Sequence, residues 1–329
     1  MRKKQVISFA LAVAVAAGLF AGCAKAAPAS SSSASSSALS SSAQTAAGSW
    51  TYTDALGHKV TINSMPQRVI SLYGSFAECW MLAGGEVIGA TDDAVKERDL
   101  DFDDDVTIVG TVKEPNLEQI IALTPDLVLL SADIAPQVQL DTALTEAKIP
   151  HIYLQMDDYR TYLEVLRGFC DLTGRDDLYA ENGIEMEQLV NEAMERAKAQ
   201  TEHPTVLLLR AFSSGVKAKA EDNLAGIILK DLGADNIASR HESLLEDLSM
   251  ETIIAEDPDY IFVTIMGTDE EAAMKSIADT LGANPAWKDL SAVKNDRFIV
   301  LPKELFHYKP NEKWGESYEY LVDILYPNE

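Results

Sequence analysis

The chain of 329 residues is strongly acidic, with 52 Asp and Glu residues against 27 Lys and Arg residues and a formal net charge of −25. This charge disfavours nucleic acid and anionic lipid as direct partners, because both repel a negative surface. Only three cysteines are present, too few for a fold held by disulfides. Cys79 and Cys170 fall in apolar helical patterns that favour buried free thiols, although the sequence leaves their redox state open.

The N-terminus has the pattern of a secretory signal peptide, predicted for residues 1–22. Basic residues 2–4 precede an apolar stretch at 6–20, which is shorter than the ~20 residues that cross a bilayer. Ala21, Gly22 and Cys23 follow. This ending resembles a lipobox, in which Cys23 is lipidated and becomes the mature N-terminus. The alternative is an ordinary signal peptide with an incidental cysteine.

Residues 23–48 are nearly all Ser and Ala. This composition has no apolar pattern to bury and predicts a flexible tether. Together with a lipid on Cys23, the tether would hold the folded region, residues 49–329, outside the cell and near its membrane. That region is long enough for two lobes with separate cores.

Strand and helix patterns alternate in the first half of the folded region and predict an N-terminal lobe at 49–158. A hairpin is expected at 50–62. The expected strands are 69–72, 87–90, 107–109, 127–130 and 151–153, and the expected helices are 76–83, 117–123 and 137–147. A connecting region at 159–203 follows, with helices at 158–172 and 176–200. The second helix, ~37 Å long at ~1.5 Å per residue, is expected to join the lobes.

The alternation resumes in a C-terminal lobe at 204–329. The expected strands are 206–209, 236–238, 260–264 and 297–301, and the expected helices are 223–232, 250–255, 272–280 and 313–325. Strands separated by helices form parallel sheets. The predicted fold class is therefore α/β, with two lobes and a ligand cleft between them.

One supersecondary unit occurs twice. The segment PNLEQIIALTPDLVLL at 115–130 recurs as LSMETIIAEDPDYIFV at 248–263. In each copy a capping residue begins a helix, Glu118 or Glu251 is its second residue, and a proline ends it before an apolar strand. A period this long is not that of a solenoid, so the repeat indicates two similar lobes.

Several spaced motifs resemble one family over the whole folded region. They are D-x-x-G-x-x-V-x-I and P-x-R-V-I-S-L at 54–72, G-x-x-x-E-P-N-L-E-x-I at 110–120, P-D-L-V at 125–128 and N-P-A-W-K-D-L-x-A-V-K at 284–294. Their order is similar to that in substrate-binding lipoproteins of ABC importers for iron-siderophore complexes, haem and cobalamin. The resemblance implies a monomer with two Rossmann-like lobes, one long helix between them and a small hinge motion. It also implies that Glu118 and Glu251 bridge to arginines on the two permease subunits.

Ligands of open parallel sheets bind beyond the carboxyl ends of the strands. The loops expected there concentrate cations in an otherwise acidic chain: Lys96, Arg98, Lys113, Arg210, Lys217, Lys219 and Lys309. Cations at this place indicate an anionic ligand, such as a haem propionate or a ferric catecholate. We expect Arg210 and Lys113 to neutralise the ligand from opposite sides and Arg98 to belong to the same site, while several of the lysines are solvated.

The loop at 305–314, LFHYKPNEKW, is the aromatic cluster of the chain. His307 and Tyr308 offer stacking faces for a flat macrocycle and potential iron ligands, although a single loop histidine is more often structural. Met266, at the end of a strand, suits an axial haem ligand or, as the simpler interpretation, the wall of an apolar pocket. Tyr73 completes the expected walls of the ligand site.

Ligand identity stays open at this stage. The hydroxamate and haem branches of the family carry residues that this chain replaces with Val112, Lys113 and Ile134. The leading hypothesis is an extracytoplasmic binding lipoprotein that captures an iron complex, siderophore or haem, and delivers it to an ABC permease. A corrinoid receptor is the runner-up.

A surface enzyme or sensor on the same fold is a third hypothesis. Nucleophile, metal-protease and phosphate-binding motifs are missing from the sequence, so we expect no enzymatic activity. The five histidines have no metal-ligand spacing, and we therefore expect no resident metal or cofactor.

Replacing Cys23 with Ala should abolish lipid attachment, because its thiol is the predicted acceptor. Metabolic labelling with a palmitate analogue should mark the wild type and a Cys79→Ala control but leave Cys23→Ala unlabelled. Equal labelling of the Cys23→Ala variant would show that the lipobox interpretation is wrong.

Overall fold

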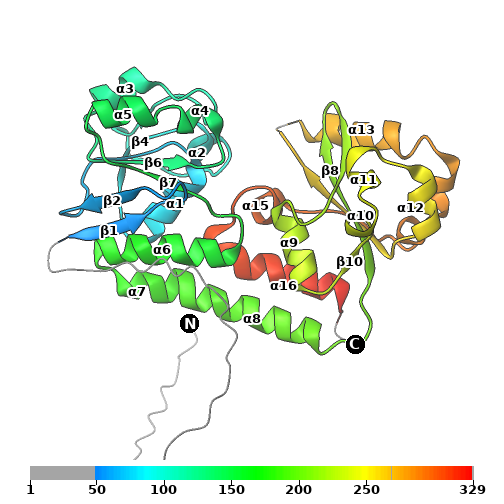
Figure 1. Ribbon diagram of the computed structural model, residues 1–329. Helices are drawn as coiled ribbons and strands as arrows, with labels where there is room; N and C mark the ends of the chain where they lie inside the picture. Colours follow the sequence, from blue (N-terminus) through cyan, green and yellow to red (C-terminus); the bar gives the residue numbers. More distant parts are fainter. Residues whose placement is uncertain (1–48, 268, 328–329) are drawn as a thin grey trace, which may run out of the picture. The chain divides into compact units, whose positions relative to one another are not determined.

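The computed structural model describes residues 49–267 and 269–327. The predicted signal peptide at 1–22, Cys23 and the tether at 23–48 lie outside the described residues. Two separate sheets form in the described part of the chain, one before and one after the long connecting helices (Figure 1). None of the described helices is long and apolar enough to cross a membrane.

The N-terminal sheet has five parallel strands in the order β5-β4-β3-β6-β7. They are β3 (Val69–Ser71), β4 (Val87–Ala90), β5 (Thr107–Ile108), β6 (Leu127–Ser131) and β7 (His151–Leu154). The helices between them are α1 (Gly74–Leu82), α2 (Asp93–Lys96), α3 (Leu117–Ala122), α4 (Ala135–Val138) and α5 (Asp141–Glu146). The expected hairpin precedes the sheet as β1 (Trp50–Thr53) and β2 (Lys59–Ile62).

Both faces of this sheet are covered by helices, which explains the continuous apolar runs of its central strands. On one face, under α3 and α5, Ile70 and Ile120 belong to one core cluster. On the other face, Val69 and Trp80 pack with α1 and α6 (Tyr159–Thr173) (Figure 1).

The connecting helices follow the sheet. α6 begins at a capping box made by Asp158 and Thr161 and ends at Gly174, whose φ of 74° favours glycine. Then α7 (Asp176–Tyr179), a π-helical turn η1 (Ala180–Ile184) and α8 (Glu185–Lys198) run on without a break. The long helix predicted at 176–200 is therefore present, with a π-helical turn inside it. α8 lies along the last helix, α16 (Trp314–Leu325), where Arg196 pairs with Asp323 at 2.7 Å.

The C-terminal sheet has the parallel order β10-β8-β11-β12, with β9 antiparallel to β8. Its strands are β8 (Thr205–Phe212), β9 (Gly215–Lys219), β10 (Asp235–Asn236), β11 (Tyr260–Ile265) and β12 (Phe298–Val300). The helical segments are α9 (Leu224–Asp231), α10 (Ile237–Arg240), α11 (Ser243–Glu246), α12 (Met250–Glu256), α13 (Glu270–Thr280), η2 (Pro285–Asp289), α14 (Ser291–Lys294), α15 (Lys303–Phe306) and η3 (Asn311–Lys313). The two parallel sheets confirm the predicted α/β class.

Three local predictions are wrong. Residues 210–219, expected as a loop, are the end of β8 and the whole of β9, because the strand pattern continues on both sides of a two-residue turn. Residues 236–238 end β10 and begin α10, since the Asn236 side chain accepts the Ala238 amide at 3.1 Å and caps that helix. The single helix expected at 137–147 is α4 and α5, with a turn between them.

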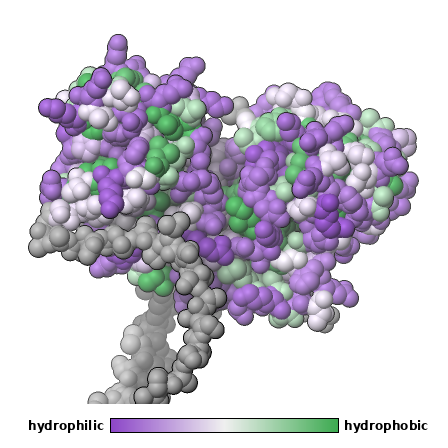
Figure 2. Space-filling view, viewed as in Figure 1, coloured by the Kyte–Doolittle hydropathy of each residue, from purple (hydrophilic) through white to green (hydrophobic). Residues whose placement is uncertain are grey.

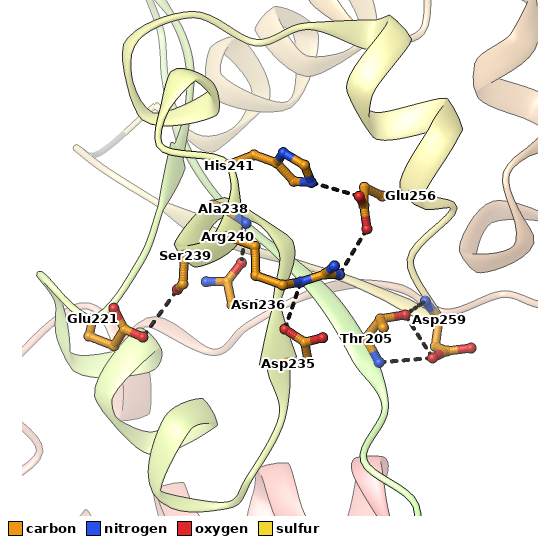
Figure 3. A network of polar contacts seen from close by, with 10 residues as sticks. All are labelled: Thr205, Glu221, Asp235, Asn236, Ala238, Ser239, Arg240, His241, Glu256 and Asp259. Carbon is orange, nitrogen blue, oxygen red and sulfur yellow. Dashed lines mark hydrogen bonds and ion pairs between the residues drawn. The ribbon is translucent and has the colours of Figure 1, made fainter.

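The repeated unit appears as α3-β6 in the first lobe and α12-β11 in the second. Asn116 and Ser249 cap their helices by accepting amides of the first turn at 3.1 and 3.2 Å. The aspartates after the two prolines also play matching parts. Asp126 and Asp259 each accept a backbone amide at the start of the neighbouring strand, at 2.8 Å in both copies, and Figure 3 shows the second contact.

A short segment of the C-terminal part binds the N-terminal lobe. We call residues 309–311, which follow α15, the strap. Lys309 Nζ donates to the Met156 carbonyl at 2.6 Å. Asn311 Nδ2 donates to the Ser75 carbonyl at 3.0 Å. The strap therefore joins the two lobes at a place other than the connecting helices.

Candidate functional site

Three predicted site residues lie towards the carboxyl ends of the C-terminal strands. Arg210 is in β8, Met266 directly follows β11, and His307 follows α15, the helix after β12. Parallel strands bring their carboxyl ends to one edge of a sheet, where open α/β folds bind ligands. The strand order therefore places Arg210 and Met266 at one edge, and His307 follows the neighbouring strand β12 after one short helix.

Arg210 carries a buried polar atom without a partner. Successive strand residues alternate between the two faces of a sheet, so Arg210 shares a face with the core residue Leu208. Its Nε is buried and has no hydrogen-bond partner among the described residues. Burial lowers the pKa of its guanidinium, and the one carboxylate that opposes this shift, Asp222, is already paired with Lys219. Such a cation gains free energy when an anion binds beside it.

His307 is neutral at pH 7. Burial, followed by the charges of Arg210 and Lys303, lowers its pKa from 6.5 to about 4. Lys303 is held in place by Glu270 at 2.9 Å. The His307 ring lies 4.8 Å from the Tyr308 ring, measured between centroids. A neutral imidazole presents a lone pair that can accept a hydrogen bond or bind a metal.

In the N-terminal lobe, the predicted site residue Tyr73 lies just beyond the carboxyl end of β3. It directly precedes α1 and packs edge-on against Phe76, with ring centroids 5.2 Å apart. Burial, followed by the charge of Asp93, raises its pKa to about 12, so the phenol stays protonated at neutral pH. Gly74 keeps the start of α1 close to α2, because a Cβ there would lie 2.8 Å from the backbone of Ala94. Tyr73 thus stands on a closely packed corner of this lobe.

Arg98, predicted as a ligand residue, is engaged within the protein. Its side chain is 8% exposed and pairs with Glu78 of α1. Its Nη1 donates to the Lys309 carbonyl at 2.9 Å, and the Asn311 side chain donates to the same Glu78 at 2.5 Å. Burial lowers the pKa of Arg98. Arg98 and Glu78 therefore anchor the strap. The Nε of Arg98, like that of Arg210, is buried without a hydrogen-bond partner among the described residues.

Lys113 and Met266 lie at the margins of the site. Lys113 is exposed in the turn between Gly110 and Pro115, and it is not among the charges that shift the pKa of Tyr73 or His307. Met266 is half-buried, and the carbonyl of the following glycine accepts a hydrogen bond from Lys303 Nζ at 2.8 Å. Met266 is thereby connected to the residues around His307, whereas Lys113 is not.

The pKa shifts show which predicted residues are close enough to influence one another. The charge of Arg98 acts on Tyr73 and on Tyr308. The charge of Arg210 acts on His307, the neighbour of Tyr308. These charge effects link Tyr73 and Tyr308 to Arg98 and link His307 to Arg210, and the His307 and Tyr308 rings are themselves neighbours.

Gln137 was not predicted from the sequence, yet it ties together three loops of the site. It is fully buried. Its Nε2 donates to the carbonyls of Leu72 at 2.7 Å and Val112 at 3.0 Å, and its Oε1 accepts the Ser131 amide at 2.7 Å. It thus joins the ends of β3 and β6 to the turn that holds Lys113. No sequence signal marks Gln137, because a glutamine near a helix start is ordinarily solvated.

A groove on the N-terminal lobe lies apart from this group. Residues of α2, β5 and the segment leading into α3 line it: Asp92, Val95, Lys96, Ile108, Gly110, Thr111, Glu114, Asn116 and Gln119. None of the predicted ligand-binding residues is among them. Since Asn116 and Gln119 flank Glu118, the groove belongs to the surface around that predicted docking residue. Glu118 and its counterpart Glu251 are both exposed.

The two described cysteines are free and buried. Burial is the largest of the causes that raise the pKa of both thiols, well above the usual value for Cys79 and to about 11 for Cys170. Neither is a reactive thiolate at neutral pH. Among the described residues, no cluster of three or more His, Cys, Asp or Glu side chains is arranged to hold a metal ion.

Comparisons with known proteins agree with this architecture. The sequence profile of the periplasmic binding protein family matches residues 69–305. The Fe(3+)-citrate-binding protein YfmC of Bacillus subtilis is 28% identical over 72% of this chain and 73% of its own length.

Two solved structures share the fold. Staphylococcus aureus SirA complexed with staphyloferrin B has a TM-score of 0.62 and 23% identity, covering 84% of this chain and 97% of that one. S. aureus IsdE complexed with heme has a TM-score of 0.63 and 19% identity, covering 79% of this chain and 98% of that one. The fold class and the family resemblance inferred from the sequence are thereby confirmed.

The lowered pKa of His307 predicts a pH dependence of stability. Between the folded pKa of about 4 and the usual 6.5, the unfolded chain binds more protons. The stabilisation from the neutral ring is therefore complete above pH 6.5 and is lost as the pH falls towards 4. From pH 7 to pH 5, the wild type should lose roughly 1 to 2 kcal/mol more unfolding free energy than His307→Gln.

Urea unfolding at the two pH values measures this difference. The exposed His203 supplies the control, and His203→Gln should follow the wild type. If His307→Gln and the wild type lose the same stability, His307 does not carry the shift.

Proposed function

Because the chain belongs to the periplasmic binding protein family, we propose that it captures an anionic iron complex outside the cytoplasm, a ferric siderophore or haem, and delivers it to the permease of an ABC importer. It acts as a monomeric carrier and not as an enzyme. A lipid on Cys23 holds it at the membrane surface. The observation that supports the anionic ligand is Arg210, whose buried Nε lacks a partner beside a neutral His307.

An anionic ligand would supply what Arg210 lacks. Moving a cation out of water costs several kcal/mol, which a close and well hydrogen-bonded opposite charge can offset. Arg98, Lys303 and Lys309 already bind carboxylates or carbonyls of the protein. The Nε atoms of Arg98 and Arg210 both lack a hydrogen-bond partner among the described residues, but Arg98 is already paired with Glu78, so Arg210 keeps the larger capacity to bind an anion. The neighbouring His307 and Tyr308 rings offer stacking faces and lone pairs.

The similar proteins support an iron complex as the ligand class. YfmC is named for ferric citrate, IsdE was solved with heme and SirA with staphyloferrin B. An iron complex with negatively charged groups fits both these names and the state of Arg210. We propose that the ligand of this chain lies within that class.

We also propose that Glu118 and Glu251 dock the protein to the two permease subunits. Both are exposed, and each is the second residue of a capped helix. The helix dipole favours a carboxylate in the first turn by ~0.3 to 1 kcal/mol. That effect accepts Asp or Glu anywhere in the turn, whereas here the same residue holds the same place in both lobes. A matched acidic pair suits a permease with two cationic contact points.

Arg210→Ala should weaken ligand binding by ~1.5 to 3 kcal/mol, which is roughly 10- to 150-fold in Kd, because a charge-assisted contact is lost. A thermal-shift screen with ferric citrate, catecholate and hydroxamate siderophores, haem and cobalamin first identifies the ligand. A ligand at 100 times its Kd adds ~2.7 kcal/mol of stability and gives a clear shift. Tryptophan fluorescence titration then compares the variants.

Lys288→Ala is the matched control, since it makes the same change in net charge at an exposed position of the same lobe. It should bind the ligand as the wild type does. Lys113→Ala tests the predicted contact from the opposite side. An unchanged Kd in both Arg210→Ala and Lys113→Ala would contradict an anionic ligand at this place and favour the corrinoid alternative.

Replacing Glu118 and Glu251 together with Ala should abolish uptake and leave folding and ligand Kd nearly unchanged, because neither carboxylate belongs to the ligand-facing group. Iron accumulation in cells, beside ligand titration of the purified variant, separates the two effects. Glu181→Ala with Glu185→Ala removes two exposed carboxylates from the connecting helix and should transport normally. Normal uptake by the Glu118 and Glu251 variant at normal surface levels would mean that the pair only caps helices.

A further inference from the structure

Exposed aliphatic side chains accompany both proposed docking carboxylates. The face visible in Figure 2 is mostly hydrophilic, with apolar residues in small separate patches. Ile121 of α3 and Ile254 of α12 are each 39% exposed. Isolated exposed aliphatic residues are common on protein surfaces. Here, however, an isoleucine with the same exposure stands at the same position of both repeated units. We therefore look for one reason, common to both lobes, why this isoleucine is exposed.

On α3, one face of the helix carries an acid and an aliphatic residue together. Residues three apart lie about 60° apart around a helix axis, so Ile121 stands beside Glu118. Ala122, the next residue, is also exposed. The preceding Ile120 is fully buried and holds the helix on the sheet. The core therefore requires Ile120 but not Ile121.

α12 repeats this arrangement. Glu251, Ile254 and Ala255 are exposed, and Ile253 is fully buried. Each lobe thus presents one glutamate, one isoleucine and one alanine on the outer face of an equivalent helix. We call these two groups the acid-aliphatic patches.

Both patches stand on helices whose ends are fixed by side chains. At the end of α12, Glu256 binds the Arg240 Nη2 at 2.8 Å and the His241 Nε2 at 2.6 Å (Figure 3). At the end of α3, Arg68 Nη2 donates to the Leu123 carbonyl at 2.6 Å. A rigid support is what a recognition surface requires, because a loose one loses entropy on binding.

We propose that the two acid-aliphatic patches are the contact points for the two halves of the permease. In each patch the isoleucine and the alanine pack against the permease, and the glutamate pairs with a cation beside them. This proposal rests on the docking function proposed above and deepens it, because it assigns part of the binding to the aliphatic residues. It also states what the partner must offer, namely a basic group next to an apolar surface, presented twice.

The aliphatic residues explain how an exposed carboxylate can dock strongly. An ion pair in open water contributes little, whereas contacts that exclude water around it make it effective. Ala122 and Ala255 have no bulk beyond Cβ, so a partner can approach the helix closely. Two equivalent patches match a partner that presents one surface twice, as a permease with two equivalent subunits does.

The connecting helix supplies an internal control. Glu181 and Ile184 have the same spacing, and Ile184 is 48% exposed. This pair lies in the connecting helix, outside both copies of the repeated unit, and it occurs once rather than twice. It should take no part in docking.

The test measures binding of the full-length protein to its permease-ATPase complex in nanodiscs by biolayer interferometry. Ile121→Ser with Ile254→Ser should weaken binding at least tenfold. Ala122→Gln with Ala255→Gln removes no contact but adds bulk, and it should weaken binding as well. Ile184→Ser should bind like the wild type. All variants change exposed side chains, so their thermal unfolding midpoints and ligand Kd should stay close to those of the wild type.

The outcomes separate this proposal from the docking function. Ile121→Leu with Ile254→Leu keeps an apolar surface and should bind nearly normally. Normal binding by both the serine and the glutamine variants, with loss of binding when Glu118 and Glu251 become Ala, would overturn the aliphatic contribution and leave docking through the carboxylates intact. Normal binding by the serine, the glutamine and the Glu118→Ala with Glu251→Ala variants alike would overturn docking through these helices altogether.

Discussion

The arrangement of the site depends on the strap, which fastens the C-terminal part of the chain to the N-terminal lobe. Lys309 Nζ donates to a backbone carbonyl of that lobe at 2.6 Å. Asn311 is fully buried with a left-handed φ of 53°, and it donates to the Ser75 carbonyl at 3.0 Å. A hydrogen bond from a charged donor contributes ~1.5 to 3 kcal/mol. Since His307 lies two residues before the strap, these bonds determine how the aromatic end of the site faces the N-terminal sheet.

Some cationic side chains near the site are paired with carboxylates of the protein, and only the remaining cations are available to a ligand. Arg98 is paired with Glu78, and Lys303 is paired with Glu270. These contacts hold the strap and the start of α15. Two of the cations near the site are therefore neutralised by carboxylates of the protein itself. Within the described residues, the buried Nε atoms of Arg210 and Arg98 both lack a hydrogen-bond partner, but only Arg98 is paired with Glu78. Under the proposal of an anionic ligand, selectivity would come from one desolvated guanidinium rather than from a broad positive surface.

Local signals made much of the fold predictable. The caps at Asn116 and Ser249, the proline stops and the apolar runs all act within a few residues, and both copies of the repeated unit formed as expected. The β8-β9 hairpin was missed because a Ser-Ser turn is a weak signal beside Asn-Gly. The roles of Arg98 and Gln137 were missed for another reason. Their partners, such as Glu78 and Val112, are 20 or more residues away in the sequence and become neighbours only when the N-terminal lobe has folded.

The position of α16 has a consequence for how the protein is made. α8 buries Met186 and Val190 in the core cluster that Tyr318 and Leu321 of α16 also join. Because α16 follows α8 by more than a hundred residues, the apolar stripe of the connecting helix has no cover until α16 itself has been synthesised. The strap, also near the C-terminus, closes at the same late stage. The first lobe can assemble its sheet without α16, but the exposed apolar stripe favours aggregation until α16 packs on it.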